Sequence, residues 1–204
     1  SPFKKSGLYT YKGSNGLMLL SHYPLIEART ISMANLSSLT RRDFIEVQVE
    51  IKKRRHHIFC THLGANLEGI APYAGDYKSW EEENYKQSEL LVTEAQKIKN
   101  DSVYIMGDFN CSFPNKTKNM QAQFLSSCQN FTKAGFVAPI MKVIPQCSFC
   151  SKNTLNEKLN IKDYLIDHIF VKNVKSKKVD VVFKDKTKIK IDKKEVETNL
   201  SDHY

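Results

Sequence analysis

Val103-Tyr104-Ile105-Met106-Gly107-Asp108-Phe109-Asn110 is the stretch on which the predicted fold depends. Its apolar run up to Met106 predicts a buried strand, and Gly107 ends that strand. Two polar side chains, Asp108 and Asn110, follow at the strand's exit. A rigid strand that delivers an acid and an amide to a cleft is one way to present catalytic groups. An Asx-stabilised turn explains the same residues without any function, so the other elements must distinguish the two.

The composition is that of a soluble globular protein, and its length predicts one domain over residues 1–204. No apolar run approaches the roughly 20 residues that span a bilayer, and no signal peptide is visible, so secreted and intracellular locations both stay open. We expect a monomer. The net charge of +9 favours anionic partners, namely nucleic acid, anionic lipid headgroups or phosphorylated substrates.

The five cysteines do not make an even disulfide framework, so the sequence leaves the redox compartment open. Cys147 and Cys150 form a CxxC motif that lacks a second pair and a histidine at zinc spacing. This pattern favours a structural or incidental role for the pair over a metal or redox role.

Periodicity predicts an alternation of strands and helices, which indicates an α/β or α+β layered domain. The alternation over Phe44–Ile51 predicts a strand with one face on a core and one face wet. Ser79 and Glu82 form a capping box before a predicted helix over Trp80–Lys99. The other predicted elements are strands over Leu17–Leu20, Glu27–Met33, His57–Thr61, Asp163–Val171, Val179–Phe183 and Lys188–Ile191, and a helix from about Lys118 to Cys128.

Polar groups of one chemical kind occur at four strand ends. They are Thr61-His62, Asp108 with Asn110, Asp167, and Asp202-His203. An acid inside an apolar run, such as Asp167, is costly unless it is paired or binds something. Together the four ends supply histidines, carboxylates and an amide, which suit metal-assisted attack of water on a phosphate ester. Carboxylates of this kind hold a hard cation such as Mg²⁺, with Mn²⁺ as the alternative.

Five motifs, in this order, resemble the endonuclease/exonuclease/phosphatase superfamily. They are Gly16–Leu25 (GLMLLSHYPL), Thr61-His62-Leu63, Gly107-Asp108-Phe109-Asn110, Ile166-Asp167-His168-Ile169 and Ser201-Asp202-His203. The superfamily includes deoxyribonuclease I, abasic-site endonucleases, neutral sphingomyelinases and inositol-polyphosphate 5-phosphatases. The resemblance implies a deoxyribonuclease I-like, four-layered α/β sandwich of two β-sheets flanked by helices, with a cleft at the strand ends.

The resemblance also implies roles for five residues. Asp108 looks like the base or orienter of the attacking water. His203 looks like the catalytic histidine, paired with Asp167 as its orienting carboxylate. Asn110 and His62 look like the groups that bind the scissile phosphate.

For the metal, the resemblance implies Asp202 and Asp108 as ligands, together with a glutamate from an early strand. That glutamate is absent, because Glu27 and Glu46 follow the GLMLLS stretch and so lie on the wrong side of it. We therefore expect the N-terminal part of the domain to be missing from this chain, a further glutamate ligand to lie upstream, and the chain to stop just short of the family's final strand.

Substrate is set by loops rather than by the shared site. The net charge and the basic stretch Lys52–Arg55 favour a nuclease, most simply an endonuclease acting on nucleic acid. A sphingomyelinase or phospholipase C-like lipid phosphodiesterase is the alternative, based on the aromatic loop Ala65–Trp80, although ordinary packing also explains those aromatic residues. A phosphoinositide phosphatase has less support. A catalytically silent binding module is disfavoured because the predicted site residues are all intact.

Overall fold

The computed structural model describes residues 16–115, 120–142, 147–159, 161–175, 178–191 and 193–204. Its larger sheet has five strands in the spatial order β1-β2-β3-β4-β5. These strands are β1 (Leu25–Ser32), β2 (Asp43–Ile51), β3 (Arg54–His62), β4 (Ser102–Asp108) and β5 (Asp167–Lys172). A second, two-stranded sheet consists of β6 (Thr187–Ile191) and β7 (Lys194–Thr198). The helices are α1 (Trp80–Gln96) and α2 (Leu125–Lys133), with short 3₁₀ turns η2 (Ala34–Leu36) and η4 (Pro139–Lys142).

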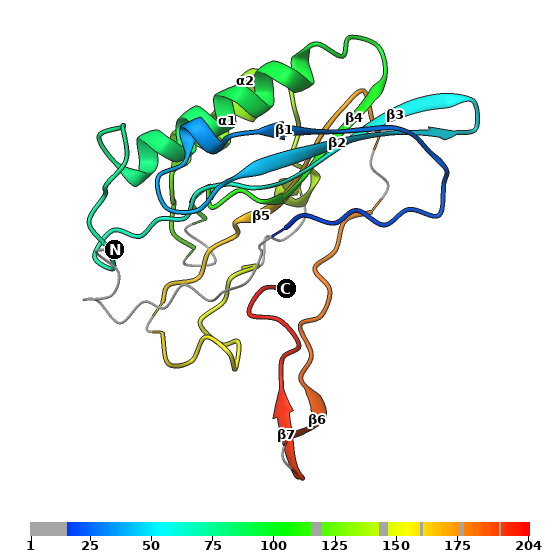
Figure 1. The fold of residues 1–204 in the computed structure, drawn as a ribbon. Coiled ribbons are helices and arrows are strands. Elements are labelled where there is room, and N and C mark those ends of the chain that lie inside the picture. Colours follow the sequence, from blue (N-terminus) through cyan, green and yellow to red (C-terminus); the bar gives the residue numbers. More distant parts are fainter. Residues whose placement is uncertain (1–15, 116–119, 143–146, 160, 176–177, 192) are drawn as a thin grey trace.

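Figure 1 shows α1 and α2 together on one face of the larger sheet, while the β6–β7 hairpin projects from the opposite side. All neighbouring strands are antiparallel except β3 and β4, which run parallel. A parallel pair needs a crossover, and α1 lies in that connection. The predicted fold class is confirmed as a mixed α/β fold with a multi-stranded sheet and a second small sheet. Neither helix of the described chain is long and apolar enough to cross a membrane.

The main core lies between the sheet and the helices. Phe59 of β3, Ile105 of β4 and Phe170 of β5 are paired in register and fully buried. Phe170 stacks on Phe131 of α2 with ring centroids 4.5 Å apart. Leu91 of α1 is also fully buried in this core. Burial of such side chains stabilises the layer by about 1.5–3 kcal/mol each.

Helix α1 begins as the sequence predicts. The Ser79 hydroxyl accepts a hydrogen bond from the Glu82 backbone N–H at 3.2 Å. The Glu82 carboxylate accepts from the backbone N–H of Lys78 at 2.8 Å, one residue before the cap. The helix ends at Gln96, three residues before the predicted Lys99, and Lys97 is its C-terminal cap.

Both faces of β2 carry buried side chains, so the prediction of one wet face is wrong. Phe44 and Glu46 lie on the face that carries the helices and are almost completely buried, as is Val47 on the other face. Glu46 tolerates burial because Arg29 donates to it at 2.6 Å and the His57 ring lies 2.8 Å from it. A buried carboxylate with two such partners behaves as part of the core.

Three other predicted elements differ from the structure. Leu17–Leu20 forms no strand, and Met18 and Leu20 are 76% and 83% exposed, because no described strand pairs with this run. The predicted helix over about Lys118–Cys128 begins only at Leu125, after residues 120–123 bridge back to residues 112–115. Residues 179–183 are irregular rather than a strand.

Four of the five cysteines are paired. Cys111 bonds to Cys128, and Cys147 bonds to Cys150 within the CxxC motif. Cys60 of β3 is free. The first disulfide joins the loop after β4 to α2, so it fixes the segment that begins directly after Asn110.

Candidate active site

Three predicted site residues form one row across the edge of the larger sheet. His62 is the last residue of β3, Asp108 the last of β4, and Asp167 the first of β5. His62 pairs with Asp108, and Asp108 pairs with Asp167, so the three side chains leave the same face of the sheet. The register that the strand patterns set therefore brings these groups together.

Backbone geometry after β4 turns Asp108 toward its neighbours. Gly107 has φ +143°, and a Cβ there would lie 1.9 Å from the Thr61 carbonyl oxygen, so only glycine fits. Asn110 adopts a left-handed conformation with φ +49°, and its backbone N–H donates to Asp108 Oδ1 at 2.8 Å. The Asn110 side-chain amide is buried and donates to the Leu63 carbonyl at 3.1 Å. Asn110 thus fixes the carboxylate of Asp108.

The C-terminal segment brings His203 to the row. His203 Nδ1 lies 2.7 Å from Asp167 Oδ2, the pairing predicted from the sequence. Two buried amides hold the segment in place: Asn153 donates to the Ser201 carbonyl and Asn156 to the Asp202 carbonyl, each at 2.8 Å. This anchoring orients the imidazole relative to the sheet edge.

Ser148 links the same segment to β5. Its hydroxyl accepts from the backbone N–H of Asp167 at 3.0 Å, and its carbonyl accepts from the Tyr204 N–H at 2.9 Å. Neither Ser148 nor the two asparagines stand out in the sequence, because they lie in a stretch without strand or helix periodicity.

The site holds its titratable groups in unusual states. Burial and the Asp167 carboxylate raise the pKa of Asp108 to about 7. The Asn110 N–H and the charges of His203 and Arg42 lower that pKa, but by less. Burial lowers the pKa of His203, but the hydrogen bond to Asp167 and nearby carboxylates outweigh it and raise that pKa to about 8. Burial and the charges of Arg42 and His203 lower the pKa of His62 to about 4. Near neutral pH the site thus pairs a weakly acidic carboxyl with a protonated His203 and a neutral His62.

The donor set fits a hard cation. Ligand atoms of Asp108, Asp167 and His203 all lie within 4.8 Å of one another. Two carboxylates this close repel each other, which is why Asp167 raises the pKa of Asp108, and a divalent cation would relieve that repulsion. Oxygen donors are those that Mg²⁺ and Mn²⁺ prefer.

The remaining acidic candidates lie apart from this cluster. Asp202 precedes His203 but is exposed and is not part of the group of ligand atoms just described. Its charge still contributes to the raised pKa of His203. Glu27 accepts from Gln48, and Glu46 is held by Arg29 and His57, so neither glutamate takes part in the site.

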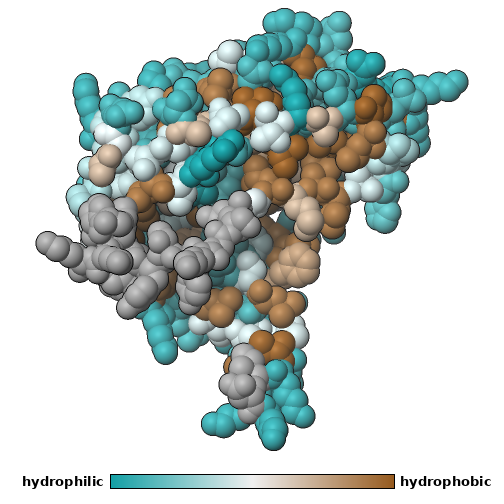
Figure 2. Space-filling model, viewed as in Figure 1, coloured by the Kyte–Doolittle hydropathy of each residue, from teal (hydrophilic) through white to brown (hydrophobic). Residues whose placement is uncertain are grey.

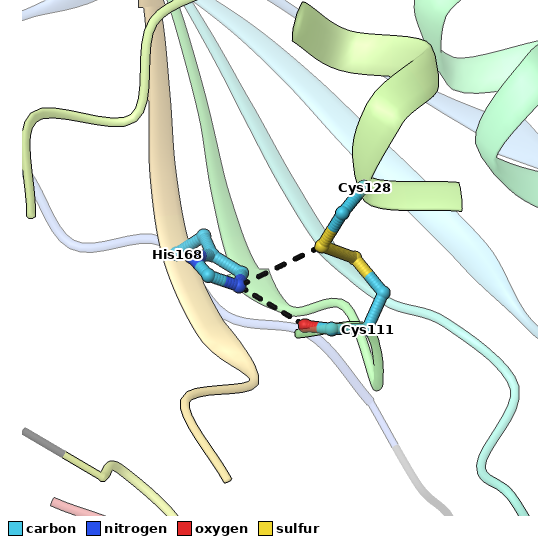
Figure 3. A group of neighbouring side chains, drawn as sticks. All are labelled: Cys111, Cys128 and His168. Carbon is cyan, nitrogen blue, oxygen red and sulfur yellow. Dashed lines mark hydrogen bonds between the residues drawn. A yellow bond between two sulfur atoms is a disulfide. The ribbon is translucent and has the colours of Figure 1, made fainter. Parts of the chain in front are cut away.

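A second cluster of Cys111, Cys128 and His168 lies behind the site in the core (Figure 3). His168 Nε2 is 3.0 Å from the Cys111 carbonyl oxygen and 3.8 Å from Cys128 Sγ. The two sulfur atoms are bonded to each other, so they offer no thiolate to a metal. The cluster therefore supports the loop after Asn110 and the start of β5.

We expect Asp108→Asn to stabilise the metal-free protein above neutral pH. The folded-state pKa of about 7 exceeds the ordinary value of 3.8, so ionising Asp108 costs folding free energy as pH rises between these values. Asparagine avoids that cost and can still accept the Asn110 N–H. The gain over wild type should grow from pH 5 to pH 8 by at least about 1 kcal/mol, since one pKa unit is about 1.4 kcal/mol. Guanidinium denaturation in chelator measures it.

Asp76→Asn, in the exposed loop before α1, is the matched control for this substitution. A gain for Asp108→Asn that stays constant from pH 5 to pH 8 would contradict the raised pKa of Asp108.

The fold and the site together define a mixed α/β protein with an acid and histidine cluster at the strand ends. The sequence model of the endonuclease/exonuclease/phosphatase family matches residues 3–203. The chain belongs to the endonuclease/exonuclease/phosphatase family. No curated protein matches it in sequence.

Several solved structures share the fold. SmcL aligns with a TM-score of 0.60 at 18% identity, covering 90% of this chain and 65% of that one. Beta toxin from Staphylococcus aureus with bound magnesium ions gives 0.59 at 17% identity, covering 90% and 64%. TDP2 from D. rerio, complexed with a single-stranded DNA product, gives 0.54 at 16% identity, covering 88% and 64%. The chain spans less than two thirds of the length of each of these structures.

Proposed function

We propose that this protein hydrolyses a phosphate ester by attack of an activated water molecule. The observation that carries the proposal is the in-register row of His62, Asp108 and Asp167, completed by the 2.7 Å contact between Asp167 and His203. Such a row places a base and a cationic donor at one sheet edge. That is the pairing that general acid–base catalysis needs.

Each side chain has a role in this proposal. Asp108 takes the proton of the attacking water, because its carboxylate lies at the sheet edge between His62 and Asp167, where the phosphate would bind. Protonated His203 donates to the phosphoryl oxygens as negative charge develops on them. Asp167 orients His203 through Nδ1. Neutral His62 binds the phosphate beside Asp108, together with the second N–H of the Asn110 amide, whose first N–H is donated to the Leu63 carbonyl.

We propose Mg²⁺ as the cofactor, with Mn²⁺ as the alternative, held by Asp108 and Asp167, whose ligand atoms lie within 4.8 Å of each other. Asp202, which the family resemblance implies as a ligand, is exposed and lies outside that group. A bound cation polarises a phosphoryl oxygen and neutralises developing charge. The magnesium-bound beta toxin structure, which shares the fold, supports a divalent cation. The closely spaced carboxylates of Asp108 and Asp167 support it independently.

Nucleic acid is the substrate class we propose first. The net charge of +9 supports this substrate class, because a basic protein binds the phosphate backbone of nucleic acid with release of counterions. The turn from Lys52 to Arg55 does not contact the phosphate that is cleaved, because it joins the ends of β2 and β3 that lie far from His62. His62 lies eight residues along β3 from Arg54, which is roughly 26 Å at about 3.3 Å per residue. This turn would contact only phosphates distant from the scissile one.

A lipid phosphodiester is the second candidate, for a different reason than the sequence suggests. The aromatic loop before α1 does not offer its rings to a membrane, because Trp80 is buried and packs edge-on against Tyr73 at 4.9 Å. Val182, Phe183 and Leu200 are among the exposed large apolar side chains, with 57%, 69% and 60% of their surface exposed. Asn199 donates to the Lys184 carbonyl, so these two segments adjoin near Asp202.

Parallel assays with one preparation test the proposal. Supercoiled DNA nicking and cleavage of sphingomyelin vesicles are each measured with Mg²⁺ and with chelator, using wild type and Asp108→Ala. We expect metal-dependent hydrolysis of one substrate, lost in the variant. Activity on neither substrate would favour a silent binding module, and activity that persists in Asp108→Ala would exclude this site as its source.

A further inference from the structure

Arg42 is a cation next to the site that forms no ion pair with the residues that the structure describes. It immediately precedes β2, and its carbonyl accepts from the Met33 N–H at 2.9 Å. Its Nε is buried and has no hydrogen-bond partner, and no carboxylate of the described residues forms an ion pair with it. The adjacent Arg41, by contrast, is exposed and paired with Asp43 at 3.1 Å. An unpaired, partly buried guanidinium is costly, so something else must offset that cost.

The charge of Arg42 acts on the catalytic row. It lowers the pKa of both His62 and Asp108, which places the guanidinium within electrostatic reach of both. Glu83 of α1 is the other nearby carboxylate. It accepts hydrogen bonds from the Ser38 N–H and the Tyr73 hydroxyl, each at 3.1 Å. Glu83 is therefore already engaged.

Arg42 and His62 line one cavity at this edge of the sheet. Its volume is about 200 Å³, and Thr30, Ile45 and the Arg41–Asp43 ion pair also line it. This is smaller than the roughly 300–1,000 Å³ of sites for drug-sized ligands, and it suits a compact group. Figure 2 shows that the coloured surface on the side of the sheet away from the helices is mixed in polarity.

We propose that Arg42 binds the phosphoryl group of the substrate and holds it against His62 and Asp108. A guanidinium presents a planar fork of N–H donors that matches two phosphate oxygens, and such charge-assisted pairs are the strong hydrogen bonds. The inference rests on the proposed phosphoester hydrolysis. It adds a substrate-binding cation that the protein supplies itself, separate from any bound metal.

Binding of inorganic phosphate tests the assignment without turnover. Calorimetric titration in chelator compares wild type with Arg42→Gln, Arg42→Lys and Arg55→Gln. The last removes the same charge at the far end of β3. We expect Arg42→Gln to bind phosphate at least about 10-fold more weakly, the scale of one charged hydrogen bond. Arg42→Lys should be intermediate and Arg55→Gln unchanged.

Equal phosphate affinity in wild type and Arg42→Gln, with equal denaturation midpoints, would overturn the assignment. So would the absence of phosphate binding by wild type. Steady-state kinetics then separate this inference from the proposed function. Arg42-dependent phosphate binding without any hydrolysis would refute the hydrolase while leaving the anion site. Hydrolysis with an unchanged kcat/KM in Arg42→Gln would refute the anion site alone.

Discussion

Replacing His203 by alanine should lower the turnover of phosphate-ester hydrolysis by at least about 10²-fold, the scale of a lost proton donor or charge-stabilising group. The imidazole meets Asp167 at 2.7 Å, and its raised pKa of about 8 keeps it protonated near neutral pH. Alanine removes both the donor and the charge. Initial rates at saturating substrate with Mg²⁺ measure the loss.

Asp108→Ala should lower turnover on the same scale, because it removes the proposed base. His22→Ala is the matched control for His203→Ala, since His22 is exposed and outside the cluster.

Asp167→Asn tests whether Asp167 acts by orienting the His203 ring. It should lower turnover and shift its pH dependence, because the His203 Nδ1–H would lose a charged acceptor. Unchanged turnover in both His203→Ala and Asp108→Ala would remove the proposed site.

The row of His62, Asp108 and Asp167 could be predicted because strand patterns are local. His62 and Asp108 lie where an apolar run ends, and such runs are visible in a window of a few residues. Asp167 lies inside the predicted strand over Asp163–Val171, and in the structure it begins β5. Once the strands lie side by side, polar groups at their ends meet at one edge. The same local signal failed at Leu17–Leu20, because an apolar run becomes a buried strand only where a partner is present.

The sequence also indicates that α1 holds in place the backbone that follows His62 and Asp108. Asn84 and Gln87 occupy the stripe of α1 that otherwise holds core residues, and both are fully buried. Asn84 donates to the carbonyls of Gly64 and Phe109 at 2.7 and 3.0 Å, and Gln87 accepts from the Gly64 N–H at 2.7 Å. Buried amides in an apolar stripe must form hydrogen bonds, so they indicate where a helix bonds to the backbone that follows two neighbouring strands.

The anchoring of His203 could not be predicted in this way. Asn153 and Asn156 reach residues 48 and 46 positions away, and neither belongs to a periodic element. Contacts of that separation leave no trace in local patterns, because only tertiary packing creates them. Local patterns also could not show that no carboxylate of the described residues pairs with Arg42, since this depends on which carboxylates the fold leaves out of reach.

Gly107→Ala should destabilise the protein by about 3 kcal/mol or more, because it combines overpacking with a strained backbone. Its Cβ would lie 1.9 Å from the Thr61 carbonyl oxygen, and backbone of the parallel neighbour β3 cannot yield as a flexible side chain can. The φ of +143° adds strain for any residue with a side chain. Relief would require the ends of β3 and β4 to separate, which would also move Asp108 away from His62. Denaturation midpoints and slopes measure the loss of stability.

Gly69→Ala supplies the comparison that isolates the clash. Gly69 also has a positive φ of +78°, but nothing lies within 4 Å of its would-be Cβ. Its substitution should cost only about 1 kcal/mol, the conformational penalty alone. If Gly107→Ala were no more destabilising than Gly69→Ala, the predicted clash with the Thr61 carbonyl oxygen would be contradicted. A larger cost for Gly107→Ala would show that the Thr61 carbonyl oxygen, and not the positive φ alone, excludes a side chain where β3 and β4 end in His62 and Asp108.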